Sequence, residues 1–340
     1  MKQALKGATV LVTGGAGYVG SVSVAALVAA GHSVMVLDDL TTGHAAAVPA
    51  GAVLRRGSYT DEASVRSLLV ASRIEAILHC AARSLVGESI REPAAYYRDN
   101  VAGGVALLEA ARKTGVKRFV FSSTAAVYGT PDETPIPEDA PLRPINTYGE
   151  TKRTLETALA WYGRAYGLRS VTLRYFNVAG ATDELGEDHD PETHLIPAIL
   201  GAVEADRTIT IFGGDYPTRD GTNVRDYIDV TDLADAHLRA IEATGAAEGD
   251  PRIDDGLLVC NLGNGDGFTN LDVLRAAETV VGRAIPHEIG PRRPGDPPTL
   301  VASASRAADV LEWHPQRPSL EEMVGSAWAW RQAHPGGYAD

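Results

Sequence analysis

Tyr148 and Lys152 are the two residues whose chemistry is easiest to specify from their type and spacing. They stand four positions apart in the segment YGETK, so on a helix both side chains project from one face. A free tyrosine has a pKa of about 10 and is a poor base at neutral pH. A neighbouring ammonium would stabilise the phenolate and let Tyr148 take or return a proton. The pair therefore predicts proton transfer at a hydroxyl group.

A glycine-rich turn lies between a predicted strand and a predicted helix. The segment Thr13–Gly20 reads TGGAGYVG, with Gly14, Gly17 and Gly20 in the spacing G-x-x-G-x-x-G. The first glycine permits a tight turn, the second lets the backbone approach a pyrophosphate, and the third lets the helix pack on its strand. The helix N-terminus would direct free N–H groups at the phosphates. The turn predicts a bound dinucleotide, whose positive nicotinamide ring would also stabilise a Tyr148 phenolate.

Polar residues end two of the predicted strands. A carboxylate at Asp38 or Asp39 would accept hydrogen bonds from ribose hydroxyls and repel a 2′-phosphate, which favours NAD over NADP. We expect one of these two residues to cap the following turn instead. Ser122 and Thr124 end another strand, at the edge where parallel sheets bind ligands. Thr124 can hydrogen-bond the same hydroxyl that Tyr148 titrates.

Short apolar runs alternate with helical patterns through the first half of the chain. This alternation predicts a Rossmann-type, doubly wound parallel sheet with helices on both faces, followed by a smaller C-terminal α/β lobe that binds the substrate. The predicted strands are 8–12, 33–37, 52–55, 75–80, 118–122 and 169–175, and the predicted helices are 21–30, 61–72, 94–114 and 148–166.

Glycine, proline and aspartate become frequent after Asn177, which predicts a smaller, loop-rich part. We assign residues 1–176 to the NAD-binding domain, together with about 226–257, and residues 177–340 to a discontinuous second domain. Helices are expected there at 194–204, 229–243, 269–281, 303–311 and 320–332, and strands at 208–212, 257–261 and 285–289.

The 340 residues have a net charge of −13, which disfavours nucleic acid and anionic membranes as partners. An anionic substrate would therefore need locally placed arginines. The only two cysteines, Cys80 and Cys260, lie in apolar runs and are expected to be buried, reduced thiols. No apolar stretch is long enough to span a bilayer, and the N-terminus has no targeting segment, so we expect a cytoplasmic protein.

Several motifs together resemble the extended short-chain dehydrogenase/reductase family and, more closely, the UDP-glucose 4-epimerases within it. They are TGGAGYVG, SSTAAVYG, YGETK, RYFNVAG and GTNVRDYIDVTDLADAH, and the resemblance runs from about residue 9 to about residue 311. It implies reversible 4-epimerisation of a UDP-hexose, UDP-galactose to UDP-glucose, a step of galactose metabolism. Tyr148 would remove the 4-hydroxyl proton, the 4-keto sugar would turn over, and NAD would stay bound. The resemblance also implies a homodimer paired through helices 94–114 and 148–166.

The resemblance implies a residue set for each ligand. The cofactor set comprises Gly14, Gly17, Tyr18, Val19, Gly20, Asp38, Asp39, Ser58, Cys80, Ala81, Ala82, Asn100, Ser122, Tyr148, Lys152 and Tyr175. The substrate set comprises Thr124 and Asn177 at the sugar, His194, Leu195, Thr210 and Phe212 at the uridine, Arg225 and Arg293 at the diphosphate, Asp296 at the ribose, and Leu300 beside the sugar's 2-position. Both arginines can make bidentate contacts with phosphate oxygens.

The chain departs from the family pattern at three of these positions. Ser58 stands where an adenine-binding aspartate is common, and Ser84, next to Arg83, stands where a cofactor-binding lysine is common. His194 replaces an asparagine. We expect no metal ion there, even with His189 nearby, because single histidines are usually structural.

Ala125 and Ala126 decide between related reactions. Nucleotide-sugar dehydratases carry an acid and a base at these positions, so two alanines favour simple oxidation and re-reduction. The alternatives are a 4-epimerase of UDP-N-acetylglucosamine, UDP-glucuronate or a UDP-pentose, a dehydrogenase that releases its cofactor, and a non-catalytic NAD-binding regulator. Leu300 bears on the use of UDP-N-acetylglucosamine. Enzymes of the family that are restricted to UDP-glucose and UDP-galactose often have tyrosine at this position, whereas those that also accept N-acetylhexosamines have a smaller residue.

Overall fold

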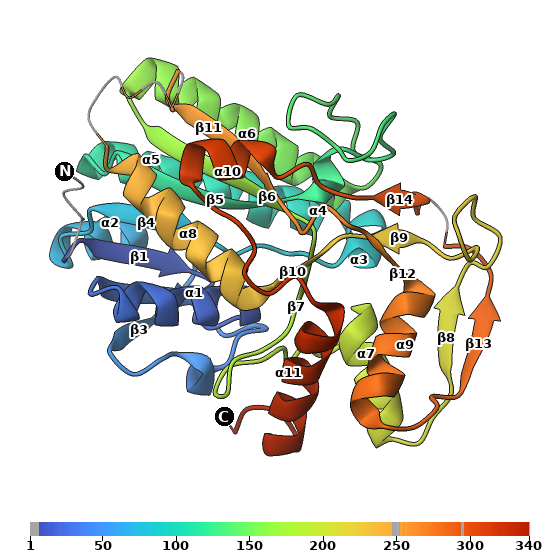
Figure 1. Ribbon diagram of the computed structural model, residues 1–340. Coiled ribbons are helices and arrows are strands. Elements are labelled where there is room, and N and C mark those ends of the chain that lie inside the picture. The colour runs from blue at the N-terminus through green and yellow to red at the C-terminus, as the bar shows by residue number, and fades with distance from the viewer. Residues whose placement is uncertain (1–6, 247–249, 251, 254, 294–295, 340) are drawn as a thin grey trace.

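Seven parallel strands form the central sheet of the molecule (Figure 1). The computed structural model describes residues 7–246, 250, 252–253, 255–293 and 296–339. The strand order is β11-β6-β5-β4-β1-β2-β3, with parallel pairing throughout. The strands are β1 (Thr9–Thr13), β2 (Ser33–Asp38), β3 (Ala52–Arg56), β4 (Ala76–His79), β5 (Arg118–Thr124), β6 (Arg169–Tyr175) and β11 (Leu257–Leu262).

Helices cover both faces of this sheet, which confirms the predicted Rossmann-type fold. Successive residues of β1 serve opposite faces: Val10 and Val12 enter one apolar core and Leu11 enters the other. The first core receives α1 (Tyr18–Ala29), α8 (Val230–Thr244) and α10 (Ser305–Leu311). The second receives α2 (Glu62–Ala71), α5 (Gly104–Thr114) and α6 (Thr147–Tyr166).

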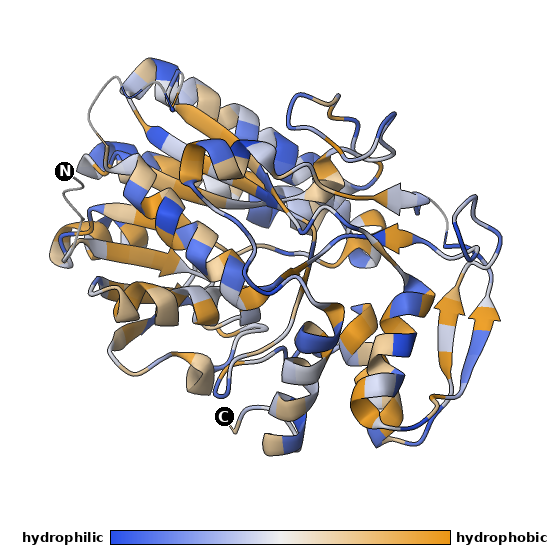
Figure 2. Ribbon diagram, viewed as in Figure 1, coloured by the Kyte–Doolittle hydropathy of each residue, from blue (hydrophilic) through white to orange (hydrophobic). Residues whose placement is uncertain are grey.

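A second part of the molecule is built on a separate apolar core. Its helices α7 (Leu195–Glu204), α9 (Asn270–Val281) and α11 (Leu320–Ala333) bury Ile199, Leu274 and Met323 against one another. Figure 2 shows the hydrophobic residues gathered along β1 in the large sheet and along α7 here. Short strands complete this part: β7 (Asn177–Ala179) with β10 (Tyr227–Asp229), β8 (Ile209–Phe212) with β13 (His287–Gly290), and β9 (Val224–Arg225) between β12 (Phe268–Thr269) and β14 (Thr299–Leu300).

Two expectations about the elements are wrong. The strand at 257–261 was expected in the smaller part, but β11 pairs with β6 and forms an edge of the large sheet. The single helix expected over 94–114 is divided into α4 (Pro93–Tyr96), the π-helical turn η2 (Tyr97–Gly103) and α5. The turn brings Gly103 so close to Thr60 that a Cβ would lie 2.5 Å from its methyl group.

The remaining short elements are α3 (Val86–Arg91) and two 3-10 turns, η1 (Ala45–Ala47) and η3 (Ala125–Val127). Among the described residues, no helix is both long and apolar enough to cross a membrane. Residues 1–6, where the sequence indicated no targeting segment, lie outside the described part of the chain.

Candidate active site

Contacts within the chain require glycine at two of the three positions of the G-x-x-G-x-x-G pattern between β1 and α1. Gly14 has a φ of +71°, and a Cβ there would lie 2.6 Å from the backbone nitrogen of Ala81. A Cβ on Gly20 would collide with the carbonyl group of Gly14. These two glycines therefore let the turn close and let α1 pack on it.

Gly17 differs from the other two glycines because nothing in the chain demands it. Its φ of −84° suits any residue, and the nearest atom to an added Cβ is the Gly14 oxygen at 3.5 Å, an ordinary contact. Gly17 is also the N-cap of α1, and no side chain caps this helix. A pyrophosphate against exposed N–H groups explains both features. The residues of the turn thus fit a dinucleotide.

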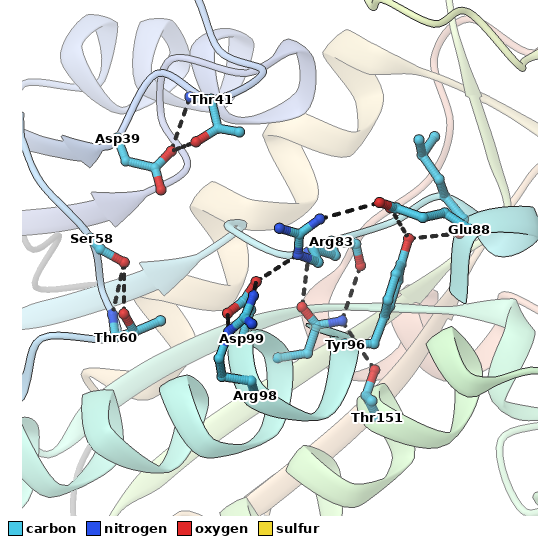
Figure 3. Close-up of polar contacts among 12 residues, drawn as sticks. Asp39, Thr41, Ser58, Thr60, Arg83, Glu88, Tyr96, Arg98, Asp99 and Thr151 are labelled. Atoms are coloured by element: carbon cyan, nitrogen blue, oxygen red, sulfur yellow. Dashed lines mark hydrogen bonds and ion pairs between the residues drawn. The ribbon is translucent and has the colours of Figure 1, made fainter. Parts of the chain in front are cut away.

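Asp38 and Asp39, of which one was expected to cap the following turn, make different contacts. Asp39 is exposed, and its Oδ1 accepts hydrogen bonds from the amide of Thr41 at 3.0 Å and from the Thr41 hydroxyl at 2.6 Å, so Asp39 caps the turn (Figure 3). Asp38 is buried and accepts from the amides of Ala16 at 3.0 Å and Leu40 at 2.9 Å. Burial raises the pKa of Asp38, while these hydrogen bonds lower it. Asp38 thereby joins the end of β2 to the glycine turn.

Tyr148 and Lys152 lie on the first two turns of α6, on one buried face, as their spacing predicted. Asn146 caps the helix by accepting the amide of Gly149 at 2.8 Å. A Cβ on Gly149 would collide with the carbonyl oxygen of Ala126 in η3, so the helix begins directly against the end of β5. This close approach brings the Tyr148 hydroxyl near the side chain of Thr124, which lowers the pKa of the phenol.

Burial dominates the electrostatics of this pair. It raises the pKa of Tyr148 to about 12, although the Thr124 side chain lowers it, and it lowers the pKa of Lys152 to about 8. The Lys152 Nζ donates to the carbonyl oxygen of Ser122 at 2.8 Å and lies 5.8 Å from the centre of the Tyr148 ring. On balance, the groups of the chain alone therefore do not lower the pKa of Tyr148, as the sequence predicted that Lys152 would. A positive charge on a bound ligand next to the phenol would lower it.

Asn100 joins the π-helical turn to the loop after β4. Its Oδ1 accepts the amide of Arg83 at 2.8 Å, and its Nδ2 donates to the Arg83 carbonyl at 3.0 Å and to the Thr151 hydroxyl at 3.1 Å. Ala81, Ala82, Asn100 and Lys152 line one small pocket with His79, Phe121, Thr151 and Leu155. The structure thus brings the predicted cofactor residues of β4, η2 and α6 together.

Arg83 is bound by two carboxylates, as Figure 3 shows. Its Nε lies 2.6 Å from Asp99 and its Nη1 3.3 Å from Glu88. Its guanidinium therefore does not stand free to replace the missing lysine. Ser58 is likewise used locally, because its hydroxyl lies 2.9 Å from that of Thr60.

A buried polar chain missed by sequence reasoning connects the predicted cofactor residues to α8. The Ser122 hydroxyl lies 3.3 Å from the Cys80 Sγ and 2.8 Å from the Nε2 of His237. The Nδ1 of His237 meets the Ser23 hydroxyl of α1 at 3.0 Å. Burial lowers the pKa of His237 to about 3, so its ring is neutral. The segment DLADAH gives no signal for this role, because the partners are far apart in sequence.

A second missed feature is the buried ion pair between Glu156 and Arg174. Their side chains are each 5% exposed, and an Arg174 nitrogen lies 2.6 Å from a Glu156 oxygen. Glu156 also accepts the Ser123 hydroxyl at 2.5 Å, and Arg174 donates to the Tyr128 hydroxyl at 2.9 Å. Glu156 follows Lys152 by four positions, which places both on one face of α6. The network fixes this helix against the ends of β5 and β6.

The predicted substrate residues of the second part form two groups. In the first, β14 pairs with β9 so that Leu300 lies opposite Arg225. Arg225 forms an ion pair with Asp296, and its Nη2 donates to the Pro297 carbonyl at 2.8 Å. The predicted diphosphate and ribose residues are therefore bound to each other in this group.

In the second group, the Arg293 guanidinium lies 4.3 Å from the centre of the Phe212 ring. Thr210 lies on the same strand and donates to Glu288 at 2.9 Å. His194 and Leu195 begin α7 as its N-cap and first residue. Among the described residues, no hydrogen bond or ion pair joins either of these two residues to Arg225 or Arg293.

Three further predicted residues lie in different surroundings. Tyr175 ends β6 opposite Thr124, and burial raises the pKa of its hydroxyl. Tyr18 turns away and donates to the Gly180 carbonyl at 2.6 Å. Asn177 is exposed and pairs with Tyr227 in the β7–β10 ladder.

Comparison with known proteins gives a consistent result over the whole chain. Residues 10–253 match the model of the NAD dependent epimerase/dehydratase family. The chain is 48% identical over 337 residues to the UDP-glucose 4-epimerase of Lactobacillus helveticus, covering 97% of this chain and 99% of that one. Among solved structures, it resembles the UDP-glucose 4-epimerase of Brucella ovis in complex with NAD (42% identity, TM-score 0.89, 94% and 97% of the two chains). It also resembles that of Bifidobacterium longum in complex with NAD+ and UDP (34% identity, TM-score 0.89, 97% and 100%).

Proposed function

The chain belongs to the NAD dependent epimerase/dehydratase family, and we propose that it interconverts UDP-galactose and UDP-glucose at the site of Tyr148, Lys152 and Thr124. It is an NAD-dependent epimerase that acts on a UDP-hexose. The observation that carries the assignment of residues is the position of the Tyr148 ring beside the buried Lys152, whose Nζ lies 5.8 Å from the ring centre and is held by the Ser122 carbonyl. The next two residues, Ala125 and Ala126, offer no acid or base for elimination.

NAD held at the glycine turn would supply reversible hydride transfer at C4 of the sugar. The chain moves the proton: the Tyr148 oxygen accepts it from the 4-hydroxyl and later gives it back. Thr124 holds that hydroxyl in place. Lys152 carries its charge beneath the Tyr148 ring and is fixed there by the Ser122 carbonyl.

The substrate is anionic, so the diphosphate needs positive partners in a protein of net charge −13. We assign Arg225 and Arg293 to this role, with Asp296 at the ribose and Thr210 and Phe212 at the uridine. Asp296 already forms an ion pair with Arg225. A bound UDP-sugar would therefore contact Arg225 through its diphosphate and Asp296 through its ribose. Anchoring the nucleotide away from the reacting carbon leaves the hexose free to turn.

The assignment is tested by incubating the purified enzyme with UDP-galactose and no added NAD, followed by separation of the nucleotide sugars. Formation of UDP-glucose supports it. Failure to convert any UDP-hexose would refute the proposed reaction.

A second substrate class depends on Leu300, which lies opposite Arg225 and is only partly buried. We expect the enzyme to convert UDP-N-acetylglucosamine as well, because leucine leaves more room than tyrosine at this position. Leu300→Tyr should lower kcat/KM for this substrate by roughly 10- to 100-fold while kcat/KM for UDP-galactose changes little. Parallel kinetics with both sugars decide the matter, and an unchanged ratio would show that residue 300 does not select at the 2-position.

The enzyme is further proposed to be a homodimer paired through η2, α5 and α6. Large hydrophobic side chains remain exposed there: Tyr97 (45%), Val105 (36%), Trp161 (61%) and Tyr166 (51%). Such a group is typical of a protein–protein interface. Trp161→Glu should convert the dimer to a monomer in sedimentation, whereas Val53→Glu, an equally exposed residue on β3, should not. Wild-type protein that sediments as a monomer would contradict the proposal.

We also propose a cytoplasmic location. Cys80 and Cys260 are both free thiols, and Cys260 is fully buried, as suits a reducing compartment.

A further inference from the structure

The segment that joins β7 to α7 (Figure 1) carries four side chains that could hold a metal ion. They are Glu187, His189, Glu192 and His194, and each offers one oxygen or nitrogen, with all of these atoms within 4.8 Å of one another. His194 is also one of the residues that the resemblance places at the uridine, whereas the two glutamates, which supply the oxygen ligands, are not among the predicted site residues. We expected no metal ion because single histidines are usually structural. Here two histidines and two glutamates lie together.

The distances within the cluster are close to the spacing of ligands around a small cation. The Nδ1 of His194 lies 2.7 Å from Glu187 and 3.0 Å from Glu192, and the Nδ1 of His189 lies 3.1 Å and 4.0 Å from the same two residues. A tetrahedral zinc ion with bonds of 2.0–2.1 Å holds its ligand atoms about 3.4 Å apart. Three of the four distances are shorter than this value, and the two to Glu192 involve its different oxygens, so the side chains would have to shift to admit the ion.

The charge of the cluster also suits a divalent cation. Although burial opposes it, the hydrogen bonds to Glu187 and Glu192 raise the pKa of His194 to about 10, so zinc would displace a proton from this imidazole. With both imidazoles deprotonated the cluster would carry a charge of −2, and Glu187 is held inside the protein with its side chain only 9% exposed. Buried carboxylates need a positive partner. Two imidazole nitrogens with two carboxylate oxygens form a donor set that zinc accepts readily, whereas Mg²⁺ and Ca²⁺ prefer oxygen alone.

We propose that Glu187, His189, Glu192 and His194 bind one structural zinc ion. Four protein ligands leave no open position for a substrate, which distinguishes the site from a catalytic zinc centre. The ion would close an eight-residue loop whose two sides contact different parts of the enzyme.

The neighbours of the loop indicate what the ion would hold in place. The Tyr18 ring, from the glycine turn, stands edge-on to His189 with 6.5 Å between ring centres. His194 is the N-cap of α7, and Asp188 accepts the amide of Tyr338 near the C-terminus at 2.9 Å. The zinc ion would thus fix α7 relative to the cofactor turn without contacting the reacting atoms.

The test is zinc content, measured by mass spectrometry on protein without an affinity tag. Metal-free enzyme is incubated with Zn²⁺ alone and desalted. Wild type should retain roughly one zinc per chain, the double variant His189→Ala/His194→Ala almost none, and the control His314→Ala, an exposed histidine outside the cluster, as much as wild type. Cobalt substitution should give the visible spectrum of a four-coordinate site in wild type only.

A conservative variant guards against loss of folding. Glu187→Gln keeps the size of the side chain, and it should weaken zinc binding at least about tenfold, since even outer-shell changes cost that much. Zinc should raise Tm of the wild type by roughly 5 °C or more and leave Tm of this variant nearly unchanged. Wild type that retains only adventitious, substoichiometric zinc, or a double variant that retains as much as wild type, would show a hydrogen-bonded cluster and overturn the proposal. The test depends on zinc content and Tm rather than on epimerase activity, because His194 is also a predicted uridine residue.

Discussion

Tyr148→Phe should lower kcat for UDP-galactose by about 100- to 10,000-fold, the range expected when a positioned acid–base group is removed. The ring stays, so the packing on Lys152 and the fold are retained, and only the oxygen that moves the proton is lost. Steady-state kinetics, with circular dichroism and NAD content as checks on folding, measure the effect. Tyr166→Phe, an exposed tyrosine on the same helix, serves as the control and should retain wild-type kcat.

The pH dependence gives this prediction a second readout. The reactive form of Tyr148 is the phenolate, whose fraction rises with pH up to the pKa of the group. The kcat/KM of the wild type should therefore rise with pH on the acidic side of that pKa, which the chain alone raises to about 12 and bound NAD must lower. The residual activity of Tyr148→Phe should lack this rise. A variant that keeps both its rate and its pH profile would remove Tyr148 from the proton transfer.

Gly17→Ala should weaken NAD binding strongly with only a small loss of stability. The added Cβ makes only an ordinary contact within the chain, at 3.5 Å from the Gly14 oxygen, but it occupies the side of the turn that the pyrophosphate approaches. We expect at least a tenfold loss of NAD affinity by titration. Because alanine is a poor N-cap, Tm should fall by only about 2–4 °C relative to NAD-free wild type, the equivalent of about 1 kcal/mol.

Gly14→Ala provides the contrast for this experiment. Its Cβ would lie 2.6 Å from the Ala81 nitrogen, on a residue whose φ is +71°, so both the fold and NAD binding should suffer. The two variants separate what the chain needs from what the ligand needs. Stoichiometric NAD in purified Gly17→Ala would show that the turn does not approach the pyrophosphate as proposed.

The parts of the enzyme that could be predicted from sequence are those coded by local patterns. The glycine turn, the strand before it and the face shared by Tyr148 and Lys152 each depend on residues within one or two elements, and the structure places them as expected. Asp38 and Asp39 were predicted as a pair, and only the hydrogen bonds of Thr41 and Ala16 reveal which one caps the turn.

Three of the features that escaped prediction depend on contacts between distant segments. β11 joins β6 across more than eighty residues, and its apolar run would suit a strand of either part. The partners of His237 come from two other elements, and Arg174 meets Glu156 only when β6 lies against α6. Periodicity describes one element at a time and carries no information about which elements become neighbours.

The central claim is that NAD stays in the site and is recycled within each turnover. The most direct test uses UDP-galactose that carries deuterium on C4, with a pool of free, unlabelled NAD present. The account predicts UDP-glucose with deuterium retained on C4 and no deuterium in the free cofactor pool. Deuterium transferred to the free pool, or a product that carries hydrogen at C4, would contradict it.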